Sequence, residues 1–179
     1  MKRQDRYDSL CQWWAHVYGL DWRRVKAQLL AESSMDPLAV SPKGALGLAQ
    51  FLPETWDWLW RELVGSDPAQ RDVFNPEHAI EACCIYMRHL YECYGEIPDE
   101  TERYRMALAA YNAGRGNVNR MLAEARKACG APDSYAEWET AGRKPGPWQE
   151  WSFASRFLSL VTGANAHETI QYVRRVMGS

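Results

Sequence analysis

Glu32 is the residue of this 179-residue chain whose position most clearly allows chemistry. Trp22, Val25 and Leu29 recur at helical spacing, and the next step of that apolar stripe is Glu32. Apolar surroundings and the negative end of a helix dipole both disfavour an ionised carboxylate, so this group can hold a proton at neutral pH. It could then act as a general acid, as the cleavage of a glycosidic bond requires. The alternative is a glutamate that only caps or pairs at a helix end.

The segment that begins at Glu32 reads ESSMDPLAVSPKGALGLAQFLPETW and resembles the catalytic motif of the Slt-type, family 1 lytic transglycosylases of the lysozyme superfamily. The matching positions are Glu32-Ser33, Pro37, Ala39, Ser41, Gly44-Ala45, Gly47-Leu48, Gln50, Pro53 and Thr55. Later blocks resemble the family's remaining motifs in the same order: Asn75-Pro76 with Ala79-Ile80, Ala110 to Gly114, and Glu168-Thr169 with Tyr172-Val173. The resemblance extends from about Leu20 to the C-terminus.

This resemblance implies that Glu32 is the catalytic acid and base. On the basis of this resemblance and of their positions, we expect eight further residues to contact the sugars: Ser33, Ser41, Gln50, Leu52, Tyr111, Asn112, Glu168 and Tyr172. Three of them have a structural alternative. Ser41 could stabilise the turn before Pro42, the Gln50 amide could close the loop through backbone bonds, and Asn112 at a helix end is typical of local backbone bonding.

The last predicted helix presents two faces. Ile170, Val173 and Met177 share one face, whereas Glu168 and Tyr172 lie four residues apart on the opposite one. We therefore expect the second face to point away from the core of that helix. A solvated face is the alternative to a glycan-binding one.

Helical periodicity runs through the whole chain, which predicts an all-α, lysozyme-like fold of goose or Slt type with a cleft. The length suits one domain, residues 1–179. Helices are expected over about 7–18, 22–32, 54–63, 76–94, 102–111, 117–129 and 167–177. Asp21 is expected to cap the second helix, and Asn165 with Glu168 resembles a capping box for the last. Gly44 and Gly47 indicate a loop whose backbone approaches another group closely.

The resemblance has departures. Ala49 and Leu52 stand where the family usually has methionine, which affects the fit of the substrate rather than the chemistry. The interval between Gly114 and Glu168 is longer than usual, and about 130–164 is expected to be an insert or flap, irregular over 142–151. Its rings are Tyr135, Trp138, Trp148 and Trp151. Packing of these rings onto the body is the favoured interpretation, and a platform for sugars is the alternative.

Charge and cysteine content exclude several classes of protein. Twenty-one Lys and Arg against 23 Asp and Glu give a net charge of -2, so no nucleic-acid partner is expected. The five cysteines show no metal-site spacing, and Cys83 and Cys84 fall on an apolar helical stripe, so we expect buried thiols, no metal and no cofactor. No signal peptide or membrane insertion is expected, and the chain is predicted to be a monomer made in the cytoplasm.

The region between Pro37 and Pro53 contains no Asp or Glu, so it offers no second carboxylate to activate water. Together with the resemblance, this favours a lytic transglycosylase that cuts peptidoglycan between N-acetylmuramic acid and N-acetylglucosamine and leaves a 1,6-anhydro end. The alternatives are a hydrolase of the same bond and a non-catalytic glycan-binding virion module. The expected absence of an export signal suggests a bacteriophage enzyme that reaches the periplasmic wall at lysis or within a virion.

Overall fold

A computed structural model describes residues 3–132, 135–142 and 146–178 of the chain. In this part of the chain the regular structure is helical, and the β structure is limited to the isolated bridges Val40–Leu46 and Leu46–Phe51. The expected all-α class is therefore confirmed. The chain divides into two compact units, residues 1–88 and 89–179, so a single domain over 1–179 stays a prediction. Among the described helices, none combines the length and apolar character that a membrane span needs.

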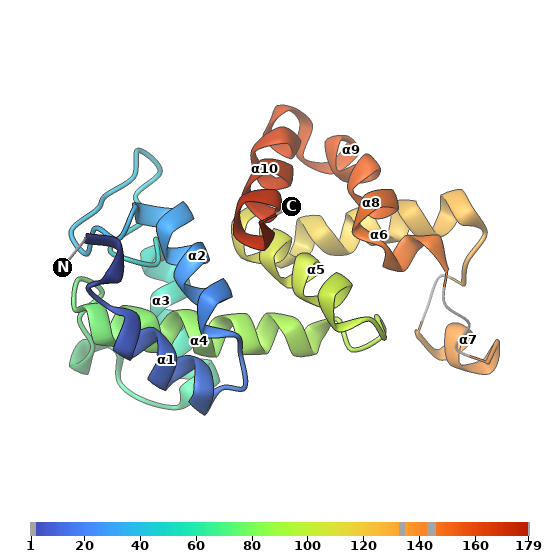
Figure 1. Cartoon of the computed structure of the whole chain (residues 1–179). Coiled ribbons are helices and arrows are strands. Elements are labelled where there is room, and N and C mark those ends of the chain that lie inside the picture. The colour runs from blue at the N-terminus through green and yellow to red at the C-terminus, as the bar shows by residue number, and fades with distance from the viewer. Residues whose placement is uncertain (1–2, 133–134, 143–145, 179) are drawn as a thin grey trace. The chain divides into compact units, whose positions relative to one another are not determined.

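The first unit is built on two adjacent helices, α1 (Asp8–Val17) and α2 (Trp22–Ser33), which pack against each other (Figure 1). Lys26 of α2 forms ion pairs with Asp8 at 2.7 Å and Asp5 at 2.9 Å, which tie the N-terminal turn to α2. The other elements are the 3-10 turns η1 (Arg3–Asp5) and η3 (Pro68–Gln70), α3 (Pro53–Trp58), the π-helical turn η2 (Leu59–Val64), and α4 (Pro76–Cys93), which continues into the second unit.

Helix α2 has well-defined ends. The Asp21 side chain accepts a hydrogen bond from the Arg23 amide at 2.9 Å, which confirms the expected cap. After Ser33 the backbone turns sharply, because Ser34 and Met35 both adopt left-handed conformations with φ of 54° and 62°. Such conformations are costly for residues other than glycine and persist where packing holds them, and the Met35 side chain is fully buried. The chain that follows Glu32 is thus redirected within two residues.

The core of the first unit is apolar and rich in aromatic rings. Cys83 and Cys84 of α4 are completely buried, as their position on an apolar stripe predicts. Trp56 packs edge-on against both Phe51 and Trp60, with ring centroids 5.7 and 5.5 Å apart. These rings support the end of the loop that precedes α3.

The second unit is centred on α5 (Glu100–Ala113), which packs against α6 (Arg115–Cys129) and α10 (Ala166–Met177). Asp99 caps α5 by accepting from the amides of Thr101 and Glu102, each at 2.9 Å. The shorter elements of this unit are α7 (Tyr135–Thr140), η4 (Pro147–Gln149), α8 (Trp151–Ala154), η5 (Ser155–Phe157), α9 (Leu158–Thr162) and η6 (Gly163–Asn165).

Part of the region expected to be irregular is helical, namely Pro147–Gln149 and Trp151. Between Gly146 and Asn165 the chain forms short helical turns, which Figure 1 shows leading through α8 and α9 to α10. The prediction of an irregular segment over 142–151 is wrong for the residues of η4, because tertiary contacts order that short turn. Residues 133–134 and 143–145, with Pro145 among them, lie outside the described residues, as does the Tyr135 side chain.

Hydrogen bonds and rings fasten η4 to the body of the second unit. Trp148 is 2% exposed, lies beneath the Arg126 guanidinium at 4.1 Å and meets the largely buried Trp138 edge-on at 6.4 Å. The Gln149 side chain donates to the Glu96 carbonyl at 2.6 Å. The packing interpretation of the rings is confirmed for Trp138 and Trp148, while Trp151 is half-buried.

Thiol reactivity provides a test of this packing. Cys11, Cys83 and Cys84 are buried, Cys93 is exposed and Cys129 is half-buried. Burial raises the pKa of the Cys11 thiol to about 12 and also raises the pKa of Cys84. We expect an aromatic disulfide reagent at pH 8 to label Cys93 rapidly in the native protein and the three buried thiols only after unfolding. Native labelling should disappear in the double variant Cys93→Ser/Cys129→Ser, which keeps only the three buried thiols, and its persistence there would show that a buried thiol is accessible.

Candidate active site

The loop of residues 34–52 is held against the end of α2 by the side chain next to Glu32. The Ser33 hydroxyl donates to the Leu48 carbonyl at 2.8 Å and accepts from the Asp36 amide at 3.2 Å. Glu32 itself is half-buried in the last turn of α2. Ser33 was expected to contact sugar, but its hydroxyl is engaged within the protein. Its evident role is to fix the loop beside Glu32.

Backbone bonds fold the same loop into two short ladders. Leu46 and Phe51 exchange hydrogen bonds of 2.9 and 3.1 Å, and the Gly47 amide donates to the Ala39 carbonyl at 2.8 Å. The loop is therefore ordered by its own hydrogen bonds although it contains no regular strand.

Ser41 closes a tight turn within this loop. Its backbone amide donates to the Ala45 carbonyl at 2.9 Å, and its hydroxyl accepts from the Ala45 amide at the same distance. The alternative that Ser41 stabilises the turn is thus confirmed. A hydroxyl that accepts a bond keeps its own proton, so Ser41 can still donate to a ligand.

Gln50 closes the loop from the other side. Its backbone is left-handed, with φ of 52°, and its side-chain amide donates to the carbonyls of Gly47 at 2.9 Å and Ala39 at 3.3 Å. The loop-closing interpretation is confirmed, and the orientation leaves the carbonyl oxygen of the amide as an acceptor for a ligand. Leu52, just before α3, is 43% exposed and could offer an apolar contact.

The remaining predicted residues lie in the second unit. Tyr111 is half-buried near the end of α5, and Glu168 is exposed in the first turn of α10. The Asn112 side chain accepts from the Thr169 hydroxyl at 2.8 Å, which joins α5 to α10. Asn112 thus has a structural role, but through this contact between two helices rather than through the local backbone bonding expected from the sequence. That all these residues line one cleft with Glu32 stays a prediction.

The placement of Tyr172 corrects the sequence prediction. Tyr172 is 5% exposed and shares the buried face of α10 with Thr169, Val173 and Val176, whereas Ile170 is only half-buried. The predicted face was wrong because Thr169 was not counted as a core residue, yet its hydroxyl is satisfied by Asn112. Glu168 does lie on the exposed face.

The expected cap of α10 is also absent. Asn165 is the last residue of η6, with right-handed φ and ψ of -73° and -11°, and its side chain makes no capping bond. An Ncap side chain caps from an extended backbone, which Asn165 does not have.

Comparison with known proteins assigns the chain to a family. The model of the transglycosylase SLT domain matches residues 9–132. The chain belongs to this family. Curated relatives include the membrane-bound lytic murein transglycosylases F of Yersinia pestis, 29% identical over 89% of this chain, and of Marinobacter nauticus, 30% identical over 97%. The chain spans about a third of the length of each, 31% and 32%.

Solved structures show the same fold. The 70 kDa soluble lytic transglycosylase Slt70 of Escherichia coli matches with a TM-score of 0.62 and 23% identity, over 97% of this chain and 23% of Slt70. The lytic transglycosylase Slt of Pseudomonas aeruginosa matches with a TM-score of 0.59 and 18% identity, over 96% of this chain and 25% of Slt. The lysozyme-like, Slt-type class expected from the sequence is confirmed.

Two further features define the chemistry available to this SLT domain. Among the described residues, no group of three or more His, Cys, Asp or Glu side chains is placed to hold a metal ion. Asp36 and Glu54 are the acidic residues that flank the Pro37–Pro53 segment, and one of the Asp36 carboxylate oxygens accepts from the Leu38 amide at 3.1 Å.

The sequence indicated a close backbone approach at two glycines of this SLT domain, and the structure finds it at one. Gly47 has a φ of 71°, and a Cβ atom placed there would lie 2.2 Å from the Val73 carbonyl oxygen. Gly44 has a φ of 81° but meets no atom within 4 Å. The contribution of Val73 could not be foreseen, because the 65–75 segment carries no periodic signal.

These two glycines form a matched pair for mutation. We expect Gly47→Ala to lower the free energy of unfolding by about 3 kcal/mol or more. The new Cβ atom would have to displace the Val73 carbonyl, and the left-handed backbone at position 47 adds strain for any residue other than glycine. Gly44→Ala should cost only about 1–2 kcal/mol, the cost of a left-handed conformation alone. Urea unfolding curves measure both values. Equal losses would mean that the contact with Val73 does not constrain the loop.

Proposed function

We propose that this chain is a lytic transglycosylase that cleaves the β-1,4 bond between N-acetylmuramic acid and N-acetylglucosamine in peptidoglycan, with Glu32 as acid and then base. The observation that carries the proposal is the position of Glu32. It is half-buried at the end of α2, inside the segment that matches the SLT family, with the ordered loop tied beside it through Ser33. The names of the murein transglycosylases among its relatives support this substrate class.

The reaction needs one protein carboxyl group that changes its protonation state. Glu32 gives its proton to the oxygen that links the two sugars as the bond to C1 breaks. The acetamido group of the muramic residue stabilises the positive charge at C1. The Glu32 carboxylate then takes the proton of the C6 hydroxyl, whose oxygen attacks C1 and closes the 1,6-anhydro ring. Glu32 ends protonated, as it began, and no water is consumed.

The surroundings of Glu32 favour this route over hydrolysis. Hydrolysing glycosidases generally use a second carboxylate as nucleophile or as base for water. The Pro37–Pro53 segment supplies none, and Asp36 uses one carboxylate oxygen to hold the turn at Leu38. An internal hydroxyl of the same sugar is then the better-placed nucleophile, because its attack loses little freedom of motion.

The same proposal assigns roles to the other residues. Ser41 donates to the substrate, the carbonyl oxygen of the Gln50 side chain accepts from it, and Leu52 packs against a sugar face. In the second unit Tyr111 and Glu168 contact the strand. The remaining predicted residues are Ser33, Asn112 and Tyr172. They hold the substrate-contacting residues in position and do not contact the substrate themselves. We further propose that the chain acts as a monomer on glycan strands and opens the bacterial wall for a bacteriophage.

Replacement of Glu32 by glutamine tests the catalytic assignment. The amide has the shape of the carboxyl group but cannot deliver a proton, so Glu32→Gln should fold normally and lose about 10²-fold or more of its activity. Turbidity of a purified wall suspension gives the activity, and circular dichroism with thermal melting confirms the fold. Glu62→Gln, at an exposed position on η2, is the matched control and should keep full activity. Lysis by Glu32→Gln at more than a tenth of the wild-type rate would contradict the assignment.

The chemical form of the product distinguishes transglycosylation from hydrolysis. Muropeptides released by the enzyme should end in 1,6-anhydro-N-acetylmuramic acid, which is lighter than the hydrolysed form by one water molecule and has no reducible end. Digestion in oxygen-18 water should therefore introduce no label at C1, as mass spectrometry can show. Labelled, reducible muramic ends would identify a hydrolase and would require a carboxylate outside the Pro37–Pro53 segment.

A further inference from the structure

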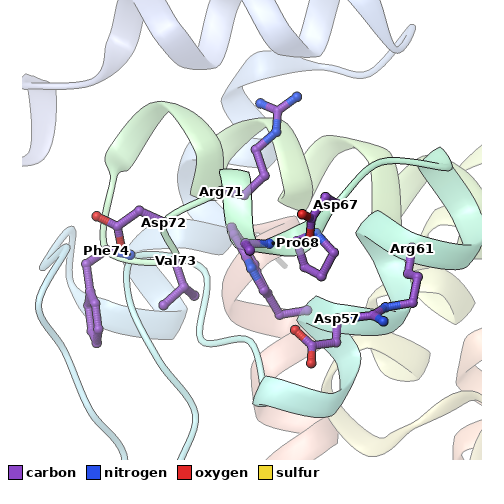
Figure 2. Close-up of a pocket in the computed structure, with 10 residues that line it drawn as sticks. Asp57, Arg61, Asp67, Pro68, Arg71, Asp72, Val73 and Phe74 are labelled. Carbon is purple, nitrogen blue, oxygen red and sulfur yellow. Dashed lines mark hydrogen bonds between the residues drawn. The ribbon is translucent and has the colours of Figure 1, made fainter.

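The first unit contains a pocket of about 430 Å³ that no predicted sugar-contacting residue lines (Figure 2). It lies between α3 with η2 on one side and the 67–74 segment on the other. Trp56, Pro68 and Val73 give it apolar walls, and charged side chains surround them. This combination of apolar surface and charge is typical of a site for a polar organic ligand rather than of unfilled core.

Two of the charged side chains that line the pocket are unpaired. Neither Arg61 nor Asp57 makes a hydrogen bond or ion pair with any residue that the structure describes. Arg71 differs, because it pairs with Glu81 at 2.8 Å and lies over the Trp60 ring at 4.3 Å. Figure 2 shows its guanidinium group directed away from Asp57 and Arg61. Arg61 is thus the cation available to a ligand.

Carboxylates outnumber this available cation. Asp67 and Asp72 each use one oxygen to accept from a backbone amide, of Ala69 and Phe74 respectively, at 2.9 Å. Each carboxylate therefore keeps a second oxygen for a ligand, in addition to the whole carboxylate of Asp57. The excess of negative charge disfavours phosphate-rich or other polyanionic ligands. It favours a molecule that carries an amine together with a carboxylate.

The pocket also adjoins the loop that lies beside Glu32. Val73 lines the pocket, and its carbonyl oxygen is the group that the Gly47 backbone approaches so closely. The next residue of the loop, Leu48, accepts the hydrogen bond from Ser33. A ligand in this pocket would thus contact the segment that supports the active-site loop.

We propose that this pocket binds a short peptide with a free amine and a free carboxylate, the chemistry of the stem peptides that branch from peptidoglycan strands. The identification of this peptide as a peptidoglycan stem rests on the proposed function. Arg61 receives the carboxylate, the aspartates receive the amine, and the aliphatic part of the peptide lies against Trp56 and Val73. The pocket is then a specificity site for strands that carry stems.

Calorimetric titration of the whole chain with a sugar-free stem tetrapeptide that contains a diamino acid tests the site directly. Saturable binding is expected, and Arg61→Met should weaken it about tenfold or more through loss of a charge-assisted bond. With the C-terminally amidated peptide, wild type and Arg61→Met should bind equally. Arg23→Met, which removes an arginine elsewhere in the same unit, is the control and should bind both peptides as wild type does. Absence of saturable binding, or an equal effect of Arg61→Met on both peptides, would overturn the proposal.

Kinetics separate this proposal from the proposed function. On stem-bearing strands Arg61→Met should raise KM and leave kcat unchanged, whereas on strands stripped of their peptides it should match wild type. An active enzyme whose KM does not respond to the stems would refute the peptide site alone. Peptide binding without any glycan cleavage would refute the proposed activity and leave the pocket as a peptide-binding site.

Discussion

The hydrogen bond from the Ser33 hydroxyl to the Leu48 carbonyl sets the position of the active-site loop. Its net contribution to stability is about 1 kcal/mol, as for most such bonds, but its location gives it a larger consequence. Ser33 adjoins Glu32 in sequence, so the bond ties the loop directly to the last turn of α2, which carries the proposed acid. Hydrogen bonds within the loop, made by Ser41 and Gln50, then fix the positions of the two polar groups proposed to bind the substrate, the Ser41 hydroxyl and the Gln50 side-chain carbonyl.

Helix α2 also carries a buried polar side chain, and no hydrogen bond within the described part of the chain offsets the free-energy cost of burying it. Gln28 is fully buried, and its side-chain amide makes no hydrogen bond to the residues that the structure describes. An unpaired buried amide costs about 1–3 kcal/mol. Gln28 precedes Glu32 by four residues, so both side chains lie on the same side of the helix. The helix that positions the proposed acid is therefore not optimised for stability alone.

The sequence predicted what depends on periodicity and on local motifs. It gave the all-α class, the Asp21 cap and the burial of Cys83 and Cys84, because each follows from helical spacing or a neighbouring amide. It failed where tertiary contacts decide. Tyr172 was placed on the wrong face because a buried threonine bonded to Asn112 is invisible to a hydrophobic pattern. The short turn η4 was missed because its order comes from Trp148 and Gln149 contacting distant residues.

The contact between Gly47 and the Val73 carbonyl has a consequence for protein engineering. Two segments that are separated in the sequence, residues 34–52 and 71–75, approach each other closely at this point. If the loop alone were exchanged for that of a relative, the new loop would have to pack against a Val73 segment from a different protein. Chimeras that transfer both segments together should therefore be recovered as folded proteins more often than chimeras that transfer the loop alone.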